Sequence, residues 1–129
     1  MEQRDYSIPK RILIVDDDEA TIFGYTRFLS RSGFAIESAM DLATSLDKLS
    51  REHFDAVVFD LRLPDGNALD VIPAVRAKNK NLKIFVVSGL SDPAVVEQAL
   101  DAGADKFLVK PLSIEELCNQ ITGAFPPKV

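Results

Sequence analysis

The sequence predicts an α/β protein built on a doubly wound parallel sheet of five strands, with helices on both faces. Five short apolar runs alternate with five stretches whose apolar residues recur every three or four positions, the pattern expected of alternating strands and helices. The runs are apolar at consecutive positions, so both faces of each strand are expected to be buried. Right-handed connections between parallel strands then place helices on both sides of the sheet.

Each expected strand is a compact apolar run that ends at polar or turn-forming residues. The first, RILIV, stops at a row of three aspartates, and the third ends abruptly at Asp60, shortly before the turn residues of 64–67. A buried strand is expected to leave the sheet where such residues begin. The five expected strands cover residues 11–15, 34–38, 56–60, 83–88 and 106–109.

The expected helices are bounded by residues that favour helix ends. Asp41 and Ser113 are expected N-caps, and Gly33 and Gly103 end the first and fourth helices. Pro73 falls inside the third helix pattern, where a bend or a weak turn is expected. The expected apolar stripes are Ile22, Tyr25, Phe28 and Leu29, then Leu42, Leu46 and Leu49, then Leu69, Ile72 and Val75, then Val96, Ala99 and Leu100, and last Leu117 and Ile121.

Length and composition limit the class of protein. The 129 residues fit one domain, expected over residues 11–125 between a short leader at 1–10 and a tail at 126–129. A hydrophobic content of 47% argues against disorder, and the net charge of −5 argues against nucleic acid as a direct partner. The single cysteine, Cys118, is expected to be partly buried and inert, and suits a reducing compartment. No apolar run matches a membrane span or a signal peptide, so a cytoplasmic protein without membrane contact is expected.

Polar side chains follow four of the five expected strands. Asp16 and Asp17 follow the first, Asp60 ends the third, Ser88 ends the fourth and Lys110 follows the fifth. The carboxyl ends of parallel strands lie at one edge of a sheet, where open α/β sheets bind their ligands. The first and third strands are expected to be neighbours, so the three carboxylates should converge there.

Converging carboxylates indicate a bound cation or a retained proton. Two like charges about 4 Å apart repel by roughly 4 kcal/mol at an effective dielectric of about 20. Oxygen donors without histidine or cysteine favour Mg²⁺ over zinc. Lys110 and Ser88 are suited to phosphoryl oxygens, and a carboxylate can be the nucleophile that forms an aspartyl phosphate. Asp60 is the best-placed candidate for that nucleophile.

Four motifs together resemble the receiver domain of two-component response regulators. They are ILIVDDD at 12–18, DLRLPDG at 60–66, VVSG at 86–89 and AGADKFLVKP at 102–111, and the resemblance covers about residues 10–125. It implies a flavodoxin-like (βα)₅ fold with the strands in the order 2-1-3-4-5.

The resemblance also implies the site. Asp60 would accept a phosphoryl group from a histidine kinase or phosphotransfer protein, and Lys110 would pair with that group. Mg²⁺ would be held by Asp60, by Asp17 directly, by Asp16 directly or through water, and by the main-chain carbonyl of Arg62. Slow self-dephosphorylation would be the only chemistry, so the chain is not expected to be an enzyme.

The family's switch residues would be Ser88 and Phe107. Ser88 would move towards the phosphoryl group and Phe107 would turn inward into the vacated space. The surface formed by the fourth helix, fifth strand and fifth helix would then change, and a downstream protein, an effector domain or a second copy in a homodimer would dock there. An alternative for Phe107 is a plain core residue.

Two departures from the family pattern concern the loops beside the site. Ala68 stands where similar receivers often have glycine, so Gly66 and Asn67 are expected to supply the turn. Arg62 and Leu90 occupy the variable positions that tune the lifetime of the aspartyl phosphate in the family.

Two other functions compete with the switch. A phosphohydrolase of the haloacid dehalogenase type uses an aspartate nucleophile with a second aspartate two positions on. Asp16 and Asp18 have this spacing, but Ala20 stands where threonine or valine is expected. The other alternative is a receiver-like interaction module that works without phosphorylation, although such modules usually lose the acceptor or metal-binding acids. His53 is expected to be a solvated helix-end residue and not a phosphodonor.

Overall fold

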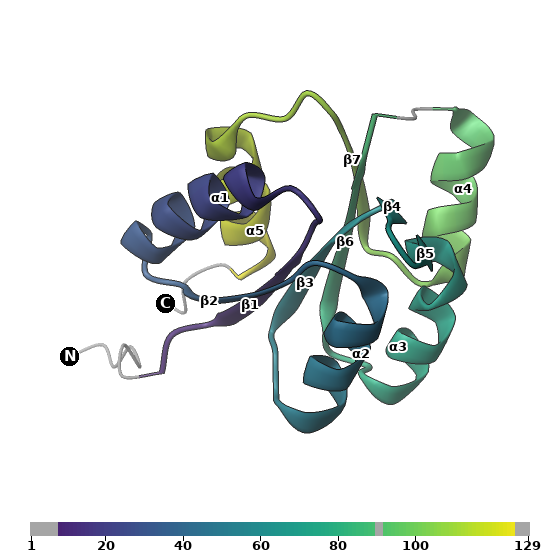
Figure 1. Ribbon diagram of the computed structural model, residues 1–129, viewed down its shortest axis with the longest axis horizontal. Coiled ribbons are helices and arrows are strands. Elements are labelled where there is room, and N and C mark those ends of the chain that lie inside the picture. Colours follow the sequence, from purple (N-terminus) through teal and green to yellow (C-terminus); the bar gives the residue numbers. More distant parts are fainter. Residues whose placement is uncertain (1–7, 90–91, 126–129) are drawn as a thin grey trace.

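A computed structural model of the chain shows five parallel strands in one sheet between two layers of helices (Figure 1). It describes residues 8–89 and 92–125. Most of the expected leader, the variable position Leu90 and the expected tail at 126–129 lie outside the described residues. Within the described part of the chain, no helix is both long and apolar enough to span a membrane.

The strand order is β2-β1-β3-β6-β7, which corresponds to the expected 2-1-3-4-5 when the sheet strands are counted along the chain. All four neighbouring pairs are parallel. The second strand lies one residue later than expected, and the other four match their expected bounds. The strands are β1 Arg11–Val15, β2 Ala35–Ala39, β3 Ala56–Asp60, β6 Lys83–Ser88 and β7 Lys106–Val109.

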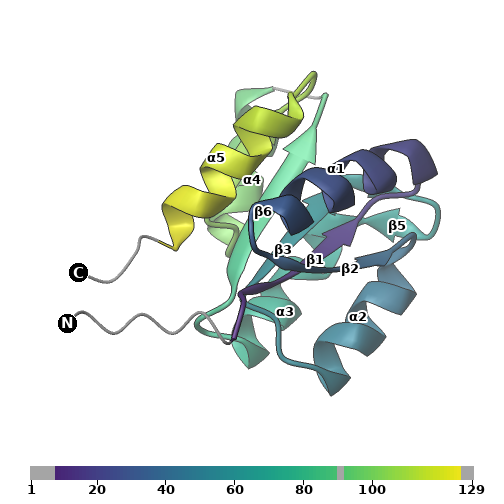
Figure 2. The ribbon, with the colours of Figure 1, turned by 90° about the vertical axis from the view of Figure 1, so that its left-hand side faces the viewer.

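Helices cover both faces of the sheet (Figure 2). One face packs against α1 (Glu19–Arg31) and α5 (Ile114–Ala124). The other packs against α2 (Leu42–Arg51), α3 (Ile72–Lys78) and α4 (Pro93–Ala102). The sheet therefore lies in the middle layer, and the doubly wound prediction is confirmed.

Alternate residues of each central strand enter two separate cores. In β1, Ile12 and Ile14 pack on the α1/α5 side, whereas Leu13 and Val15 pack on the side of α2, α3 and α4. All four side chains are buried. Because successive side chains of a strand point to opposite faces, burial on both faces requires the unbroken apolar runs that the sequence shows.

The segment between β3 and α3 differs from the prediction. Arg62–Leu63 (β4) and Gly66–Asn67 (β5) form a short antiparallel hairpin, followed by a 3₁₀ turn at Ala68–Asp70. Leu69 belongs to that turn and not to α3, and Pro73 lies in the first turn of α3 and not inside it. The expected helix is therefore broken by a turn before Pro73, and the proline itself lies where a helix start tolerates it, because it removes no internal hydrogen bond there.

The predicted apolar stripe of α4 is wrong in part. Ala99 is buried, but Leu100 is 45% exposed, and Val95 packs against the core beside the half-buried Val96. The helix carries apolar residues on several sides, which leaves more than one choice of inner face. Cys118 is buried and not partly buried as expected, with its Sγ 3.4 Å from Ser32 Oγ.

Arg76 of α3 fastens the end of α4. Its guanidinium donates to the main-chain oxygens of Gly103 and Leu82, with N···O distances of 2.9 and 2.6 Å, and to the Asp105 carboxylate at 2.8 Å. Gly103 ends α4 with a φ of 124°, and a Cβ there would lie 3.0 Å from the Cβ of Arg76. Glycine is required at this position by both its φ and the close approach of the arginine.

Candidate functional site

Three aspartates meet at the carboxyl edge of the sheet. Asp16, Asp17 and Asp60 each bring one carboxylate oxygen within 4.8 Å of the others. The register explains the meeting, because Val15 of β1 lies opposite Phe59 of β3 and the two strands end level. Asp16 is buried, Asp60 is half-buried and Asp17 is exposed, so the cluster opens to solvent on one side.

Lys110 brings a positive charge to this cluster. Its Nζ lies 3.3 Å from Asp60 Oδ2 and 3.9 Å from Asp16 Oδ2. The residue directly follows β7, and its N–H donates to the main-chain oxygen of Ser88 at 2.9 Å. Within this cluster, three carboxylates thus meet one ammonium.

Burial raises the pKa of the Asp16 carboxyl above its ordinary value, and the nearby Asp60 carboxylate adds to the effect. The N–H of Asp18 and the Lys110 ammonium oppose it without cancelling it. The third member of the aspartate run has another role. Asp18 is the N-cap of α1, and hydrogen bonds from the Thr21 hydroxyl and the Ala20 N–H lower the pKa of its carboxyl.

Ser88 lies beside Asp60, at the end of the neighbouring strand β6. Its side chain is buried. A hollow of about 360 Å³ is lined by Asp60, Arg62, Ser88 and Gly89. The structure thus gathers the acceptor candidate, the predicted carbonyl donor and the predicted switch serine around one space.

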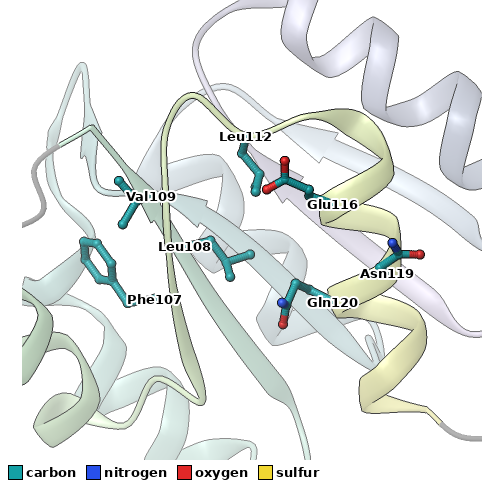
Figure 3. Close-up of a pocket in the computed structure, with 7 residues that line it drawn as sticks. All are labelled: Phe107, Leu108, Val109, Leu112, Glu116, Asn119 and Gln120. Carbon is teal, nitrogen blue, oxygen red and sulfur yellow. The ribbon is translucent and has the colours of Figure 1, made fainter.

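Phe107 lies on β7 opposite Val86 of β6, and is half-buried against the core on the side of α2, α3 and α4. Phe107 is also among the residues that line a groove of about 390 Å³ between β7 and α5 (Figure 3). Leu108 and Leu112 supply apolar lining, and Glu116 and Gln120 extend from α5 along the other wall.

The hairpin after β3 shows how this chain builds a turn without glycine at position 68. Gly66 adopts a φ of 150°, and the Asn67 side chain accepts a hydrogen bond from the Leu69 N–H at 2.8 Å. Ala68 is buried, and its N–H donates to the Leu61 oxygen. The expectation that Gly66 and Asn67 supply the turn is confirmed.

Sequence reasoning missed one contact of this hairpin. The Asp65 carboxylate accepts hydrogen bonds from the N–H groups of Leu42 and Ala43 at the start of α2. The Asp65-Gly66 pair indicated only a turn, and no signal in the sequence points to a partner 23 residues away. His53 lies far from the cluster, exposed and 3.2 Å from Asp55 Oδ1, as expected.

The sheet order and the acidic edge together define a receiver domain. The sequence profile of the response regulator receiver domain matches residues 12–122, and the chain belongs to this family. It is 38% identical over 110 residues to a protein named response regulator MprA from Mycobacterium sp. strain KMS. That match covers 85% of this chain and 48% of the relative, so the chain spans about half the length of the curated relatives it matches.

Solved structures agree with the fold. A CheY-like response regulator receiver domain protein from Methanospirillum hungatei JF-1 superposes with a TM-score of 0.86 at 30% identity, covering 90% of this chain and 93% of the other. A response regulator protein from Burkholderia pseudomallei superposes with a TM-score of 0.79 at 26% identity, covering 88% and 71%. The latter structure contains a phosphorylated aspartic acid and a calcium ion.

Proposed function

We propose that this receiver domain is a phosphorylation-dependent signalling switch in which Asp60 accepts a phosphoryl group from a histidine kinase or phosphotransfer protein. The observation that carries the proposal is the meeting of three carboxylates and one ammonium at the carboxyl edge of the sheet. Such crowding of like charges is costly unless a bound group offsets it. The cytoplasm remains our prediction for its location.

Asp60 supplies the nucleophile. One carboxylate oxygen attacks the phosphorus of a phosphohistidine, the phosphorus–nitrogen bond breaks, and its electron pair stays on the imidazole, which takes up a proton. Lys110, at 3.3 Å from Asp60 Oδ2, offsets negative charge on the phosphoryl oxygens. The Ser88 hydroxyl, at the adjacent strand end, donates to another of these oxygens.

We propose that Asp16, Asp17, Asp60 and the main-chain carbonyl of Arg62 hold Mg²⁺. All four are oxygen donors, the type that a hard cation prefers. Burial raises the pKa of the Asp16 carboxyl, so a cation beside it would stabilise its carboxylate form. When bound, the ion neutralises charge on the phosphoryl group during transfer. The residues present therefore fit the metal.

Slow attack by water on the aspartyl phosphate, which returns Asp60 and inorganic phosphate, is the only further reaction we propose. A phosphohydrolase of the haloacid dehalogenase type would need the second acid, Asp18, as a proton donor or acceptor. Its carboxylate instead accepts from the Thr21 hydroxyl at 2.6 Å and from the Ala20 N–H at 3.2 Å. This capping role favours the switch.

Phosphorylation would reach the surface through β6 and β7. It adds charge and acceptor oxygens beside Ser88. Movement of Ser88 towards them, followed by an inward turn of Phe107, would shift the equilibrium of the α4–β7–α5 surface. Ser88 and Phe107 lie on adjacent paired strands, which makes this a short route.

The charge of that surface favours a basic partner. The helices α4 and α5 carry four acidic residues and no basic one, and Lys106 is the only basic residue on β7. Leu100 and Val109 are both 45% exposed and supply apolar contact area. We therefore propose a basic, partly apolar segment of a downstream protein or effector domain as the main occupant. A second copy of this chain would place like charges together, which makes a homodimer on phosphorylation the less favoured alternative.

Intact mass after incubation with Mg²⁺ and acetyl phosphate tests the acceptor. We expect the parent to gain one phosphoryl group, the gain to require Mg²⁺, and Asp60→Asn to show none. Asp70→Asn, at an exposed acid in the 3₁₀ turn, is the matched control and should gain the group like the parent. Failure of the parent to react or to bind fluoroberyllate would favour the interaction module that works without phosphorylation.

A further inference from the structure

The loop that carries Arg62 is fastened to α2, which packs on the same face of the sheet as α3 and α4. Asp65 lies at the tip of the β4–β5 hairpin, between Leu63 and Gly66, which face each other across it. Its two carboxylate oxygens accept from the N–H groups of Leu42 and Ala43 at 2.8 and 2.9 Å. These are among the first N–H groups of α2, which have no acceptor within the helix.

Two acids share the start of α2. Asp41 precedes the helix directly and accepts from the Thr44 N–H at 2.7 Å. Asp65 comes from another part of the chain and accepts from the two preceding N–H groups. These two hydrogen bonds lower the pKa of the Asp65 carboxyl, which favours its carboxylate form. Both acids cap one helix, but only Asp65 also holds the loop after Asp60.

Apolar packing reinforces the contact at the hairpin tip. Leu63 and Leu42 are buried, and a Cβ at Gly66 would lie 3.2 Å from Leu42 Cδ1. The hairpin itself consists of two residues on each strand, and a two-stranded hairpin is marginally stable by itself in water. Its conformation therefore depends on what the tip contacts.

We propose that Asp65 is a positioning residue for the metal end of the site, because it fixes on α2 the hairpin whose first residue, Arg62, offers its main-chain carbonyl to Mg²⁺. This inference rests on the proposed function. Arg62 pairs with Asn67 across the hairpin, so an anchor at the tip restricts the orientation of the Arg62 peptide. Since coupling between two sites is reciprocal, metal binding should also tighten the start of α2.

Mg²⁺ affinity, measured by titration calorimetry, tests the positioning role. We expect Asp65→Ala to weaken binding about tenfold, the scale seen when a residue that orients a ligand is removed. Asp65→Asn keeps one acceptor oxygen, so its Mg²⁺ affinity should lie between those of Asp65→Ala and the parent. Asp41→Ala is the matched control, because it removes a cap from the same helix without touching the hairpin. It should bind Mg²⁺ within about twofold of the parent.

Amide hydrogen exchange gives a second readout that needs no metal. Asp65→Ala should speed exchange of the Ala68 N–H, which closes the loop on Leu61, whereas Asp41→Ala should not. In the parent, Mg²⁺ should slow exchange at Leu42 and Ala43. Equal weakening of Mg²⁺ binding by both variants, or parent-like binding in Asp65→Ala, overturns the proposal. If the parent itself does not bind Mg²⁺, the proposed function fails, and unchanged exchange at Ala68 in Asp65→Ala would show separately that the anchor fails.

Discussion

The two ends of the sheet differ in how their charged side chains are paired. At the amino edge, acids and bases are matched: Arg11 donates to the Glu52 carboxylate at 2.7 Å, and Lys48 pairs with Glu37 at 3.1 Å. The Asp55 carboxylate at the same edge accepts from the Arg11 N–H at 2.8 Å. At the carboxyl edge, three acids meet one lysine.

The difference shows which charges serve the fold. Pairs at the amino edge connect β1, β2 and α2 and lie among partly exposed side chains, where each contributes modestly. The carboxyl edge gathers three carboxylates in a partly buried place, which should lower stability when no cation is bound. Four predictions test this contrast between a matched edge and an unmatched one.

The largest effect is expected from Lys110→Met, which removes the ammonium that contacts Asp60 and Asp16. Transfer from acetyl phosphate should slow by about 10²-fold, because charge on the phosphoryl oxygens loses its partner. Lys106→Met is the matched control, an exposed lysine at the start of β7, the strand that Lys110 follows, and should react like the parent. Rates are followed by intact mass. A parent-like rate in Lys110→Met would show that the lysine has no part in transfer.

Arg11→Met should reduce stability at the matched edge. The variant loses the bond to Glu52, the bond to the His53 oxygen at 2.7 Å and the stacking of the guanidinium over Phe54. We expect the free energy of unfolding in urea to fall by about 1–2 kcal/mol. Mg²⁺ affinity should not change.

Arg51→Met is the control for Arg11→Met. Its pair with Asp47 is solvent-exposed, so its loss should cost no more than about 0.5 kcal/mol. Equal losses in the two variants would show that the amino-edge network adds nothing beyond a surface ion pair.

Asp16→Asn should raise the free energy of unfolding, whereas Arg11→Met should lower it. Removing one buried carboxylate from the cluster relieves repulsion, so without Mg²⁺ the variant should gain about 1 kcal/mol, or roughly 4 °C in melting temperature. Mg²⁺ should raise the melting temperature of the parent more than that of the variant, because the variant lacks one oxygen anion. Asp101→Asn, at an exposed acid of α4, should change neither value. A destabilised Asp16→Asn would indicate that the carboxylate is already balanced.

The smallest effect is the pH dependence of the stability that Asp16→Asn gains without Mg²⁺. Burial raises the pKa of the Asp16 carboxyl in the folded state above its ordinary value of 3.8. Between pH 3.8 and the raised pKa, the folded state therefore binds more protons than the unfolded state. The free energy of unfolding contributed by this group therefore falls as the pH rises through that interval. The stability of Asp16→Asn relative to the parent should increase from pH 3.5 to neutrality in Mg²⁺-free urea titrations. A constant difference would contradict the raised pKa.

The fold and the acidic edge could be predicted because both depend on local patterns. Five apolar runs give the strands, and the polar residues at the ends of four of them, such as Asp60 and Ser88, are placed by the sheet itself. Parallel strands that end level bring these residues together whatever the loops between them do.

The features that the sequence did not predict depend on contacts between residues far apart in the chain. The anchoring of Asp65 on the N–H groups of Leu42 and Ala43 follows from where two loops meet in space, which no local pattern encodes. The inner face of α4 was misassigned because Val95 and Val96 are both apolar, and only packing selects between them. The roles of the site residues remain predictions for the experiments above.

The contact of Arg76 with Gly103 has a mechanical consequence for α4. The helix is held at its carboxyl end by hydrogen bonds to a neighbouring helix, while its first residue follows the loop after Ser88. A ten-residue helix is about 15 Å long. Any tilt about the held end therefore displaces the opposite end most, and a tilt of about 10° moves it by roughly 2.6 Å over that length. If phosphorylation moves the loop after Ser88 as proposed, Arg76 would act as a pivot that converts this movement into a change of the angle of α4, while its bond to Asp105 keeps the start of β7 in place.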